Sequence, residues 1–321
     1  MKNFFFVAVG GVLAVVIGVT FFVNGQIIIA QIFEKYPDLK GKTLFGLASS
    51  VAPKPIDGTS IAGLKRLVRY TASEEEGLIT SATLSLSKTN DGIISAKGYI
   101  IQNLNDGEVI FEHDSERLLP IASLTKLVTA VIAKKVIKDG AKIKITREIT
   151  SVYGNTAQFQ MDETLKAEDL YYPLLMVSSN DSAEALARSY GRKRFIEAMN
   201  EFAQTIGAYR TVFRDPSGLS PDNRSTAEDM TTIYSWIMEN EPEIIEITKL
   251  KSKVVRAHTW TNPAHFLSWS NYGGGKNGYT VEAKQTGVAV FYINKIPYVV
   301  VVLGSSARDG DIVKLLGKVQ R

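Results

Sequence analysis

The chain has 321 residues, of which 45% are apolar and 22% charged, with a formal net charge of +4 at pH 7. This composition is that of a globular protein with one or two domains, and it excludes wholesale disorder. The chain has no cysteine, which excludes disulfides and thiolate chemistry. The charge excess is small, and solubility explains it better than attraction to an anionic wall or lipid.

The first predicted element is a membrane-spanning helix. Residues 4–23 form a run without a charge, and Lys2 precedes it. This run has the ~20 residues that cross a bilayer as a helix. It is longer than the core of a cleaved signal peptide, so an uncleaved anchor over residues 1–30 is favoured. The charge placement predicts a single-pass protein of the cell membrane, with its N-terminus inside and its remainder on the extracytoplasmic side.

Residues 31–75 are predicted to be a membrane-proximal spacer. Prolines such as Pro37 and Pro53, and only short apolar stretches, are typical of a linker, with one short amphipathic helix near residues 64–70. A compact domain is predicted to follow over residues 76–321.

The compact domain is predicted to have strands at both ends of its sequence and helices between them. Residues 81–112 alternate between apolar and polar side chains and contain two Asn-Asp-Gly turns, as antiparallel strands do. Helices are predicted over residues 123–138, 167–177, 181–190, 195–206 and 227–238. Strands return over residues 276–280, 287–293 and 297–303, before a final helix from about Asp309. This order indicates an α+β domain, with an antiparallel sheet built from both ends of the domain and a helical subdomain.

A serine and a lysine three residues apart, Ser123 and Lys126, lie where the first long helix is predicted to begin. On a helix, these positions share one face. The serine hydroxyl would also lie at the positive end of the helix, where developing negative charge is favoured. The same spacing at Ser85 and Lys88 falls in a predicted strand, where positions three apart face opposite sides.

Ser178 and Asn180 occupy a predicted turn between two helices, from which their side chains could point into a cleft. Asp181 and Glu184 resemble a capping box for the second helix. Taken alone, this pattern also fits the alternative that Asn180 merely caps that helix.

A third short word, Lys276-Asn277-Gly278, follows three glycines and is predicted to open a strand. Glycine at position 278 would let a substrate backbone approach closely. Taken alone, this word is better explained as a glycine-rich turn before a hairpin.

A serine hydroxyl needs a base within hydrogen-bond reach before it can act as a nucleophile at neutral pH. The three histidines stand in no recognisable triad setting. Lys126 could be the base if burial and a second cation lower its pKa, and Lys276 is a candidate for that cation.

These three words and their surroundings resemble the serine-type D-alanyl-D-alanine carboxypeptidases, the low-molecular-mass penicillin-binding proteins of the β-lactamase/transpeptidase-like superfamily. The similarity runs from about residue 80 to about residue 317. The segments that carry it are 120–127, 174–183, 213–219 and 225–229. The resemblance implies a penicillin-binding, transpeptidase-like fold.

The resemblance also implies a reaction. Ser123 would attack the carbonyl of a peptidoglycan stem peptide ending in D-Ala-D-Ala, Lys126 would take its proton, and water would hydrolyse the acyl-enzyme. Ser178 would relay a proton to the leaving amine, and Asn180 would hold the acyl amide and Lys126. β-Lactam antibiotics would acylate the same serine.

For substrate binding, the resemblance implies that Lys276 faces the substrate carboxylate and that Gly278 opens room beside it. The oxyanion hole would be the backbone N–H groups of Ser123 and Tyr279. Arg308, just past the last strand, is a further candidate for contact with the carboxylate.

One residue departs from the family pattern. Threonine is usual where this chain has Asn277, and a weakened charge-assisted hydrogen bond there could cost ~1.5–3 kcal/mol. The stretch Lys284-Gln285-Thr286-Gly287 resembles the Lys-Thr-Gly word of the family but has one residue more. It is interpreted as the second strand of a hairpin.

Three alternatives stay open. A catalytically silent, membrane-anchored peptidoglycan-binding scaffold would keep the fold and lose carboxylate recognition. A β-lactamase would need a further carboxylate for deacylation, and the loop pattern that supplies it is absent. A DD-endopeptidase that cuts D-alanyl cross-links would use the same residues.

No cofactor, metal or nucleic acid partner is predicted. The glycines before Lys276 lack the strand and the spacing of a phosphate-binding loop. The sequence also lacks a basic stripe with interleaved aromatic residues.

Overall fold

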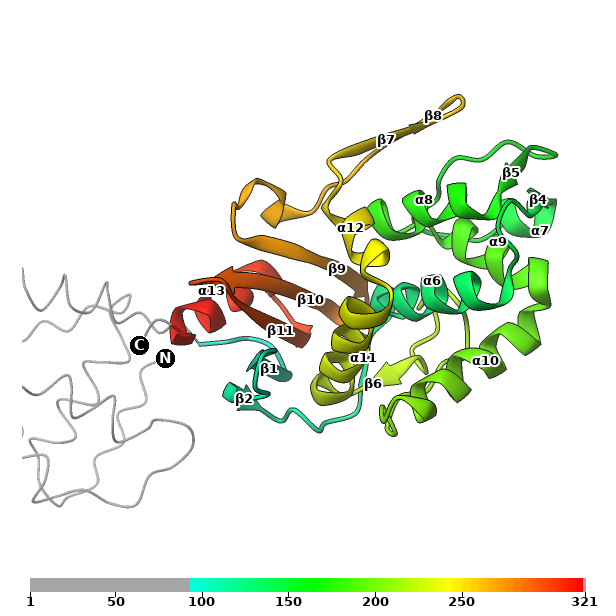
Figure 1. Cartoon of the computed structure of the whole chain (residues 1–321). Coiled ribbons are helices and arrows are strands. Elements are labelled where there is room, and N and C mark those ends of the chain that lie inside the picture. The colour runs from blue at the N-terminus through cyan, green and yellow to red at the C-terminus, as the bar shows by residue number, and fades with distance from the viewer. Residues whose placement is uncertain (1–92, 320–321) are drawn as a thin grey trace, which may run out of the picture. The chain divides into compact units, whose positions relative to one another are not determined.

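A five-stranded antiparallel sheet is the centre of the fold within residues 93–319, which are the residues that the computed structural model describes. Its strands lie in the order β2-β1-β11-β10-β9, so β1, the first strand described, pairs with the last strand, β11 (Figure 1). The bounds are β1 Gly98–Asn103, β2 Val109–His113, β9 Tyr272–Thr280, β10 Lys284–Ile293 and β11 Ile296–Ser305. The predicted α+β class, with a sheet built from both ends of the domain, is confirmed.

The helices that follow β2 gather into a lobe beside the sheet (Figure 1). Their bounds are α6 Thr125–Val136, α7 Arg147–Thr150, α8 Tyr171–Met176, α9 Asn180–Tyr190, α10 Arg192–Thr205, α11 Ala227–Asn240 and α12 Pro242–Lys249, and α13 Arg308–Val319 comes after the last strand. The 3₁₀ turns found within residues 93–319 are η2 Ala122–Leu124, η3 Ala167–Leu170 and η4 His265–Ser268. Two-stranded ribbons pair β3 Leu119–Pro120 with β6 Arg224–Ser225, β4 Lys142–Lys144 with β5 Thr164–Lys166, and β7 Ser252–Val255 with β8 His258–Thr261.

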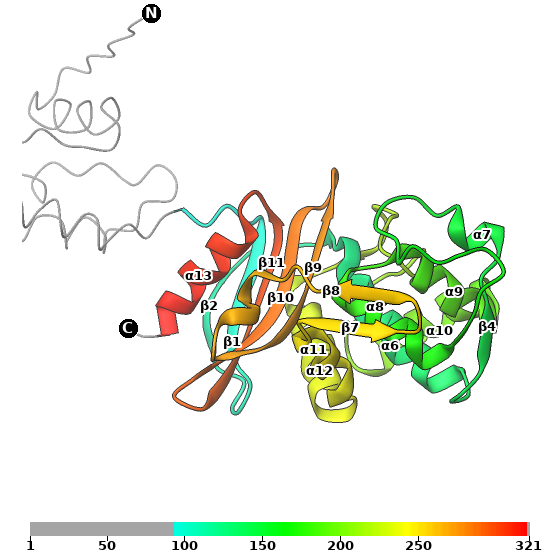
Figure 2. The same cartoon turned by 90° about the horizontal axis from the view of Figure 1, so that it is seen from above.

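Strand β11 is apolar on both faces because both faces of the sheet are covered. Val299 and Val301 pack into the core shared with the helical lobe, whereas Val300 and Val302 pack into a second core with Ile312 of α13. Successive side chains of a strand point to opposite faces, so this unbroken valine run requires two buried faces. Figure 2 shows α13 on one side of the sheet and α11 on the other.

The helix expected over residues 181–190 begins one residue earlier and has a different cap. Ser179 is the N-cap, and its Oγ accepts a hydrogen bond from the backbone N–H of Ser182 at 2.9 Å. Glu184 instead pairs with Arg188 and Arg192, each at 2.8 Å. The predicted Asp181–Glu184 capping box is therefore wrong.

The three glycines expected in a turn before Lys276 lie inside β9, which begins at Tyr272. A Cβ at Gly274 would stand 2.6 Å from Ile245 of α12, and one at Gly273 would stand 2.8 Å from the ring of Tyr292. Such distances are too short for any side chain, so the glycines let α12 and the neighbouring strand approach β9 closely.

The predicted anchor over residues 1–30, the predicted spacer over residues 31–75 and the word at Ser85 and Lys88 lie outside the described residues. Across residues 93–319, no helix combines the length and the apolar content needed to cross a membrane.

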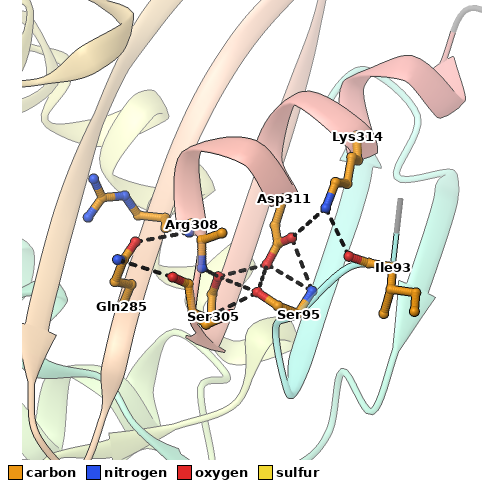
Figure 3. A network of polar contacts seen from close by, with 9 residues as sticks. Ile93, Ser95, Gln285, Ser305, Arg308, Asp311 and Lys314 are labelled. Carbon is orange, nitrogen blue, oxygen red and sulfur yellow. Dashed lines mark hydrogen bonds and ion pairs between the residues drawn. The ribbon is translucent and has the colours of Figure 1, made fainter. Parts of the chain in front are cut away.

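A buried carboxylate, Asp311 in the first turn of α13, joins the two ends of the domain (Figure 3). Its oxygens accept hydrogen bonds from the Ser95 hydroxyl at 2.6 Å, the Ser95 backbone N–H at 3.0 Å and the Ser305 hydroxyl at 2.7 Å. Burial alone would raise the pKa of Asp311, but the hydrogen bonds from Ser95 and Ser305 outweigh it and hold that pKa below its ordinary value. The segment that enters β1 is thereby fastened to the helix that follows β11.

Replacing this carboxylate should destabilise the domain. Asp311→Asn is expected to lower the free energy of unfolding by about 1.5–3 kcal/mol, because charge-assisted hydrogen bonds are lost. Since the folded-state pKa is depressed, the carboxylate contributes its stability above about pH 4 and loses it as the pH falls through that pKa. Denaturant unfolding at pH 7 and pH 3 should therefore show a difference from wild type that shrinks in acid. The control is Asp162→Asn, at an exposed ion pair with Lys144, and an equal loss in both variants would contradict the role given to Asp311.

Candidate active site

Ser123 and Lys126 lie at the start of the central helix, as the spacing predicts. Ser123 is in the η2 turn, and Lys126 is the second residue of α6, with a fully buried side chain. Lys126 Nζ lies 2.9 Å from Ser123 Oγ, 2.7 Å from Asn180 Oδ1 and 2.6 Å from the carbonyl oxygen of Ser217. A neutral amine has two N–H groups and one lone pair. It can donate to Asn180 and Ser217 and still accept the proton of the Ser123 hydroxyl.

The surroundings of Lys126 favour this neutral amine. Burial lowers the pKa of Lys126 well below its ordinary value, and the positive charge of Lys276 lowers it further. Asp215 and Asp181 act in the opposite direction and are outweighed. The second cation suggested by the sequence is thus near enough to act on the lysine beside Ser123.

The backbone around Ser123 has an unusual conformation. Ala122 has a φ of +48°, and Gly218, at φ +87°, lies directly against it: a Cβ at Gly218 would collide with the carbonyl oxygen of Ala122. Only a glycine fits at position 218 without displacing the turn that carries the serine.

The loop that brings Ser217 to Lys126 is organised by Asp215. Its Oδ1 accepts hydrogen bonds from the backbone N–H groups of Ser217 and Gly218, both at 2.7 Å, and its Oδ2 accepts from the N–H of Ser220 at 2.7 Å. Asp215, Ser217 and Gly218 were not predicted as site residues from the sequence. The Asp-Pro-Ser-Gly stretch was a visible turn signal, but its contact with α6 was not.

Asn180 contacts the same centre, and Ser178 lies two residues before it in the chain. Asn180 Nδ2 donates to the carbonyl oxygen of Tyr153 at 2.8 Å while Oδ1 accepts from Lys126, so both ends of the amide are held. Because Ser179 is the N-cap, the alternative that Asn180 only caps the helix is wrong. Ser178 has a φ of +61°, and within residues 93–319 its buried Oγ has no hydrogen-bond partner.

Strand β9 closes the other side of the site. A Cβ at Gly278 would stand 2.8 Å from the backbone nitrogen of Ser123 and 3.0 Å from the Cβ of Ala122. The glycine therefore lets the strand touch the serine turn. Tyr279, the next residue, has an exposed side chain.

Lys276 is buried, and its Nζ donates to the carbonyl oxygen of Asn277 at 2.8 Å. Burial and the positive charge of Arg308 together lower the pKa of Lys276 to about 7. This lysine can therefore gain or lose its charge near neutral pH.

Arg308 begins α13 beside the same strands (Figure 3). Its backbone N–H donates to Gln285 Oε1 at 3.0 Å, and its Nε donates to Asp309 Oδ1 at 2.7 Å. A Cβ at Gly287 would stand 2.6 Å from Arg308 Cδ. Gly287 pairs with Asn277 across β9 and β10, so Asn277 and Arg308 share one face of the sheet.

Other polar groups lie away from this centre. His258 Nε2 contacts Glu163 at 2.9 Å, and His113 stacks on Tyr99. A cavity of about 560 Å³ is lined by residues of β1, β2 and α11 and by none of the site residues. No group of three or more His, Asp or Glu side chains that could hold a metal is found among the described residues.

Gly218→Ala should destabilise the protein by more than the backbone strain of a positive φ accounts for. A positive φ costs an alanine about 1–2 kcal/mol, and the collision with Ala122 adds to this. Gly140→Ala is the matched control, because Gly140 has φ +75° with no atom within 4 Å of the added Cβ. Thermal unfolding should show a larger loss for Gly218→Ala than for Gly140→Ala. Equal losses would mean that the turn accommodates the methyl group.

Known proteins resemble this chain in sequence. A family model described as D-alanyl-D-alanine carboxypeptidase matches residues 85–307. The D-alanyl-D-alanine endopeptidase of Haemophilus influenzae is 32% identical over 50% of this chain and 56% of the relative. That of Escherichia coli is 31% identical over 56% of this chain and 57% of the relative. This chain thus spans little more than half the length of these relatives.

Solved structures show the same likeness. A D-alanyl-D-alanine carboxypeptidase from Mycobacterium tuberculosis has 26% identity and a TM-score of 0.66, covering 70% of this chain and 91% of that chain. A variant of a Streptomyces DD-transpeptidase gives 26% identity and a TM-score of 0.66, covering 70% of this chain and 98% of that chain. The family model alone matches more than half of the sequence, and on that basis the chain belongs to the D-alanyl-D-alanine carboxypeptidase family.

Proposed function

We propose that this protein is a serine-type D-Ala-D-Ala carboxypeptidase that removes the terminal D-alanine from peptidoglycan stem peptides and is acylated by penicillin. One observation carries the proposal: a fully buried lysine with a depressed pKa lies 2.9 Å from the hydroxyl of Ser123. Such a pair supplies the activated nucleophile that acyl transfer needs, without a histidine.

In the proposed reaction, Ser123 Oγ attacks the carbonyl carbon of the penultimate D-alanine while its proton moves to Lys126 Nζ. The N–H groups of Ser123 and Tyr279 stabilise the oxyanion. Ser178, whose Oγ is free of other partners among the described residues, passes a proton to the leaving amine. The C–N bond breaks, D-alanine leaves, and water hydrolyses the ester. Asn180, held by Lys126 and Tyr153, orients the acyl amide.

The terminal carboxylate of the substrate is proposed to lie near Lys276, Asn277 and Arg308. Two cations beside the strand that would receive the peptide favour an anionic group. Asn277 shares a sheet face with Arg308 and can donate through its amide in place of the hydroxyl that is usual in the family. Gly278 brings β9 against the serine turn, so a peptide bound along this strand would lie close to Ser123.

A membrane location is part of the proposal. The uncharged run over residues 4–23 is long enough to span a bilayer, and Lys2 before it favours an inside N-terminus. The catalytic domain would then act on the extracytoplasmic side, tethered through residues 31–75.

A DD-endopeptidase is the second candidate, because two relatives with more than 30% identity are named D-alanyl-D-alanine endopeptidases. The same site residues would cut a D-alanyl cross-link instead of releasing a free amino acid. Pentapeptide and cross-linked dimer substrates separate these two activities, since only the first yields free D-alanine.

Fluorescent penicillin tests the proposed nucleophile. The wild-type protein is expected to become covalently labelled and to release D-alanine from a pentapeptide, whereas Ser123→Ala should lose both reactions by at least about a hundredfold. The bound mass should persist for hours. Label lost within seconds would point to a β-lactamase, and no label on folded wild-type protein would point to the silent scaffold.

The reaction should depend on the charge of Lys276. Its depressed pKa means that the charge is present below about pH 7 and is lost above it. We therefore expect kcat/KM for a D-Ala-D-Ala peptide to fall as the pH rises through this range, because carboxylate binding weakens. Lys276→Arg keeps the charge and should move the upper limb to higher pH. An upper limb that stays in place in this variant would assign it to another group.

A further inference from the structure

The two N–H groups that would hold the oxyanion come from different elements of the fold. Ser123 belongs to the turn before α6, and Tyr279 belongs to β9. Stabilisation of a developing oxyanion requires both donors to be fixed before the reaction. Something must therefore set the position of β9 relative to the serine turn.

One buried hydroxyl touches both elements. Thr286 lies in β10, directly across from Gly278 of β9, and its side chain has no exposed surface. Thr286 Oγ1 donates a hydrogen bond to the carbonyl oxygen of Ile121 at 3.0 Å. A Cβ at Gly278 would stand 2.5 Å from the same Oγ1. The hydroxyl thus lies under Gly278 and bonds to the residue two before the nucleophile.

The rest of the serine turn is held from its other side. The backbone N–H of Ile121 donates to the carbonyl oxygen of Asn223 at 3.0 Å, and Gly218 lies against Ala122. Both of these contacts come from the segment that Asp215 organises. The carbonyl of Ile121 is also reached by the N–H of Leu124, at 3.3 Å and within the turn itself. The Thr286 hydrogen bond ties this turn to β10, beside the contact that Gly278 of β9 makes with it.

The serine turn is expected to shift if the hydrogen bond from Thr286 is lost. Ala122 is held at φ +48°, a conformation that a non-glycine residue keeps only when its surroundings impose it. The carbonyl of Ile121 immediately precedes Ala122. Its hydrogen bond from Thr286 of β10 therefore restrains the strained backbone of Ala122.

We propose that Thr286 is a positioning residue that fixes the serine turn to strand β10 and so sets the geometry of the oxyanion hole formed by Ser123 and Tyr279. The proposal rests on the function proposed above. Thr286 touches neither the substrate nor the reacting atoms. It acts through the backbone of Ile121 on one side and through Gly278 on the other.

The test compares three variants in the full-length protein. Thr286→Val removes the hydroxyl and keeps the shape, whereas Thr286→Ser keeps the hydroxyl. Thr231→Val is the matched control, because Thr231 of α11 is also buried and its Oγ1 also donates to a backbone carbonyl, that of Ala227, at 3.0 Å. Thermal unfolding of each variant measures the loss of stability. If Thr286→Val does not fold, Thr286→Ala replaces it.

Two kinetic readouts separate positioning from a structural effect. For a D-Ala-D-Ala peptide, Thr286→Val should lower kcat about tenfold or more with KM nearly unchanged, because oxyanion contacts form in the transition state. Its affinity for a peptide boronate, which forms a tetrahedral adduct with the serine, should fall by a similar factor. Thr286→Ser should restore both values to within about threefold.

Thr231→Val should lose stability but keep kcat and boronate affinity. The inference is overturned if Thr286→Val reacts as fast as wild type, if only its KM changes, or if Thr231→Val slows the reaction equally. A wild-type protein that shows no Ser123-dependent acylation would instead overturn the proposed function. The two failures are therefore distinguishable.

Discussion

The burial of the Lys126 amine among three oxygen atoms is the interaction on which the rest of the site depends. These oxygen atoms belong to the serine turn, to the start of α9 and to the loop after α10. One nitrogen thereby links three segments that are far apart in the sequence. A buried amine is tolerated only when such partners surround it. The contacts that place Lys126 beside Ser123 consequently also hold these three segments together.

The proposed mechanism needs a neutral Lys126 and a charged Lys276, and the surroundings of the two lysines lower their pKa values to different extents. Lys126 is covered by protein on all sides and adjoins a second cation, which favours its neutral form. Lys276 is more easily protonated at neutral pH, because burial and the charge of Arg308 lower its pKa only to about 7. Pairs of titratable groups whose surroundings drive their pKa values apart are typical of acid–base catalysis. A charged substrate arriving at Lys276 would add to this separation.

Much of the fold and the central pair could be predicted from the sequence because they are local. The helical phase that brings Ser123 and Lys126 together, and the valine run of β11, need no distant information. The capping prediction was wrong because the carboxylate of Asp181 accepts hydrogen bonds from the backbone N–H groups of Ala157 and Ser182. Asp215 and Gly218 were missed because their partners are brought near by tertiary folding. The roles of Tyr279 and Arg308 stay predictions.

The order of strands has a consequence for how the domain acquires its site. The central strand β11 is the last strand of the chain, and it pairs with β1, the first one described. The sheet cannot assemble by zipping consecutive strands from the N-terminus, and its contacts join residues far apart in sequence. Such topologies fold slowly and pass through incomplete states. The contacts of β9 and β10 with the serine turn can form only after nearly the whole domain has been synthesised. A partly synthesised chain would therefore contain Ser123 without the strands that complete its site.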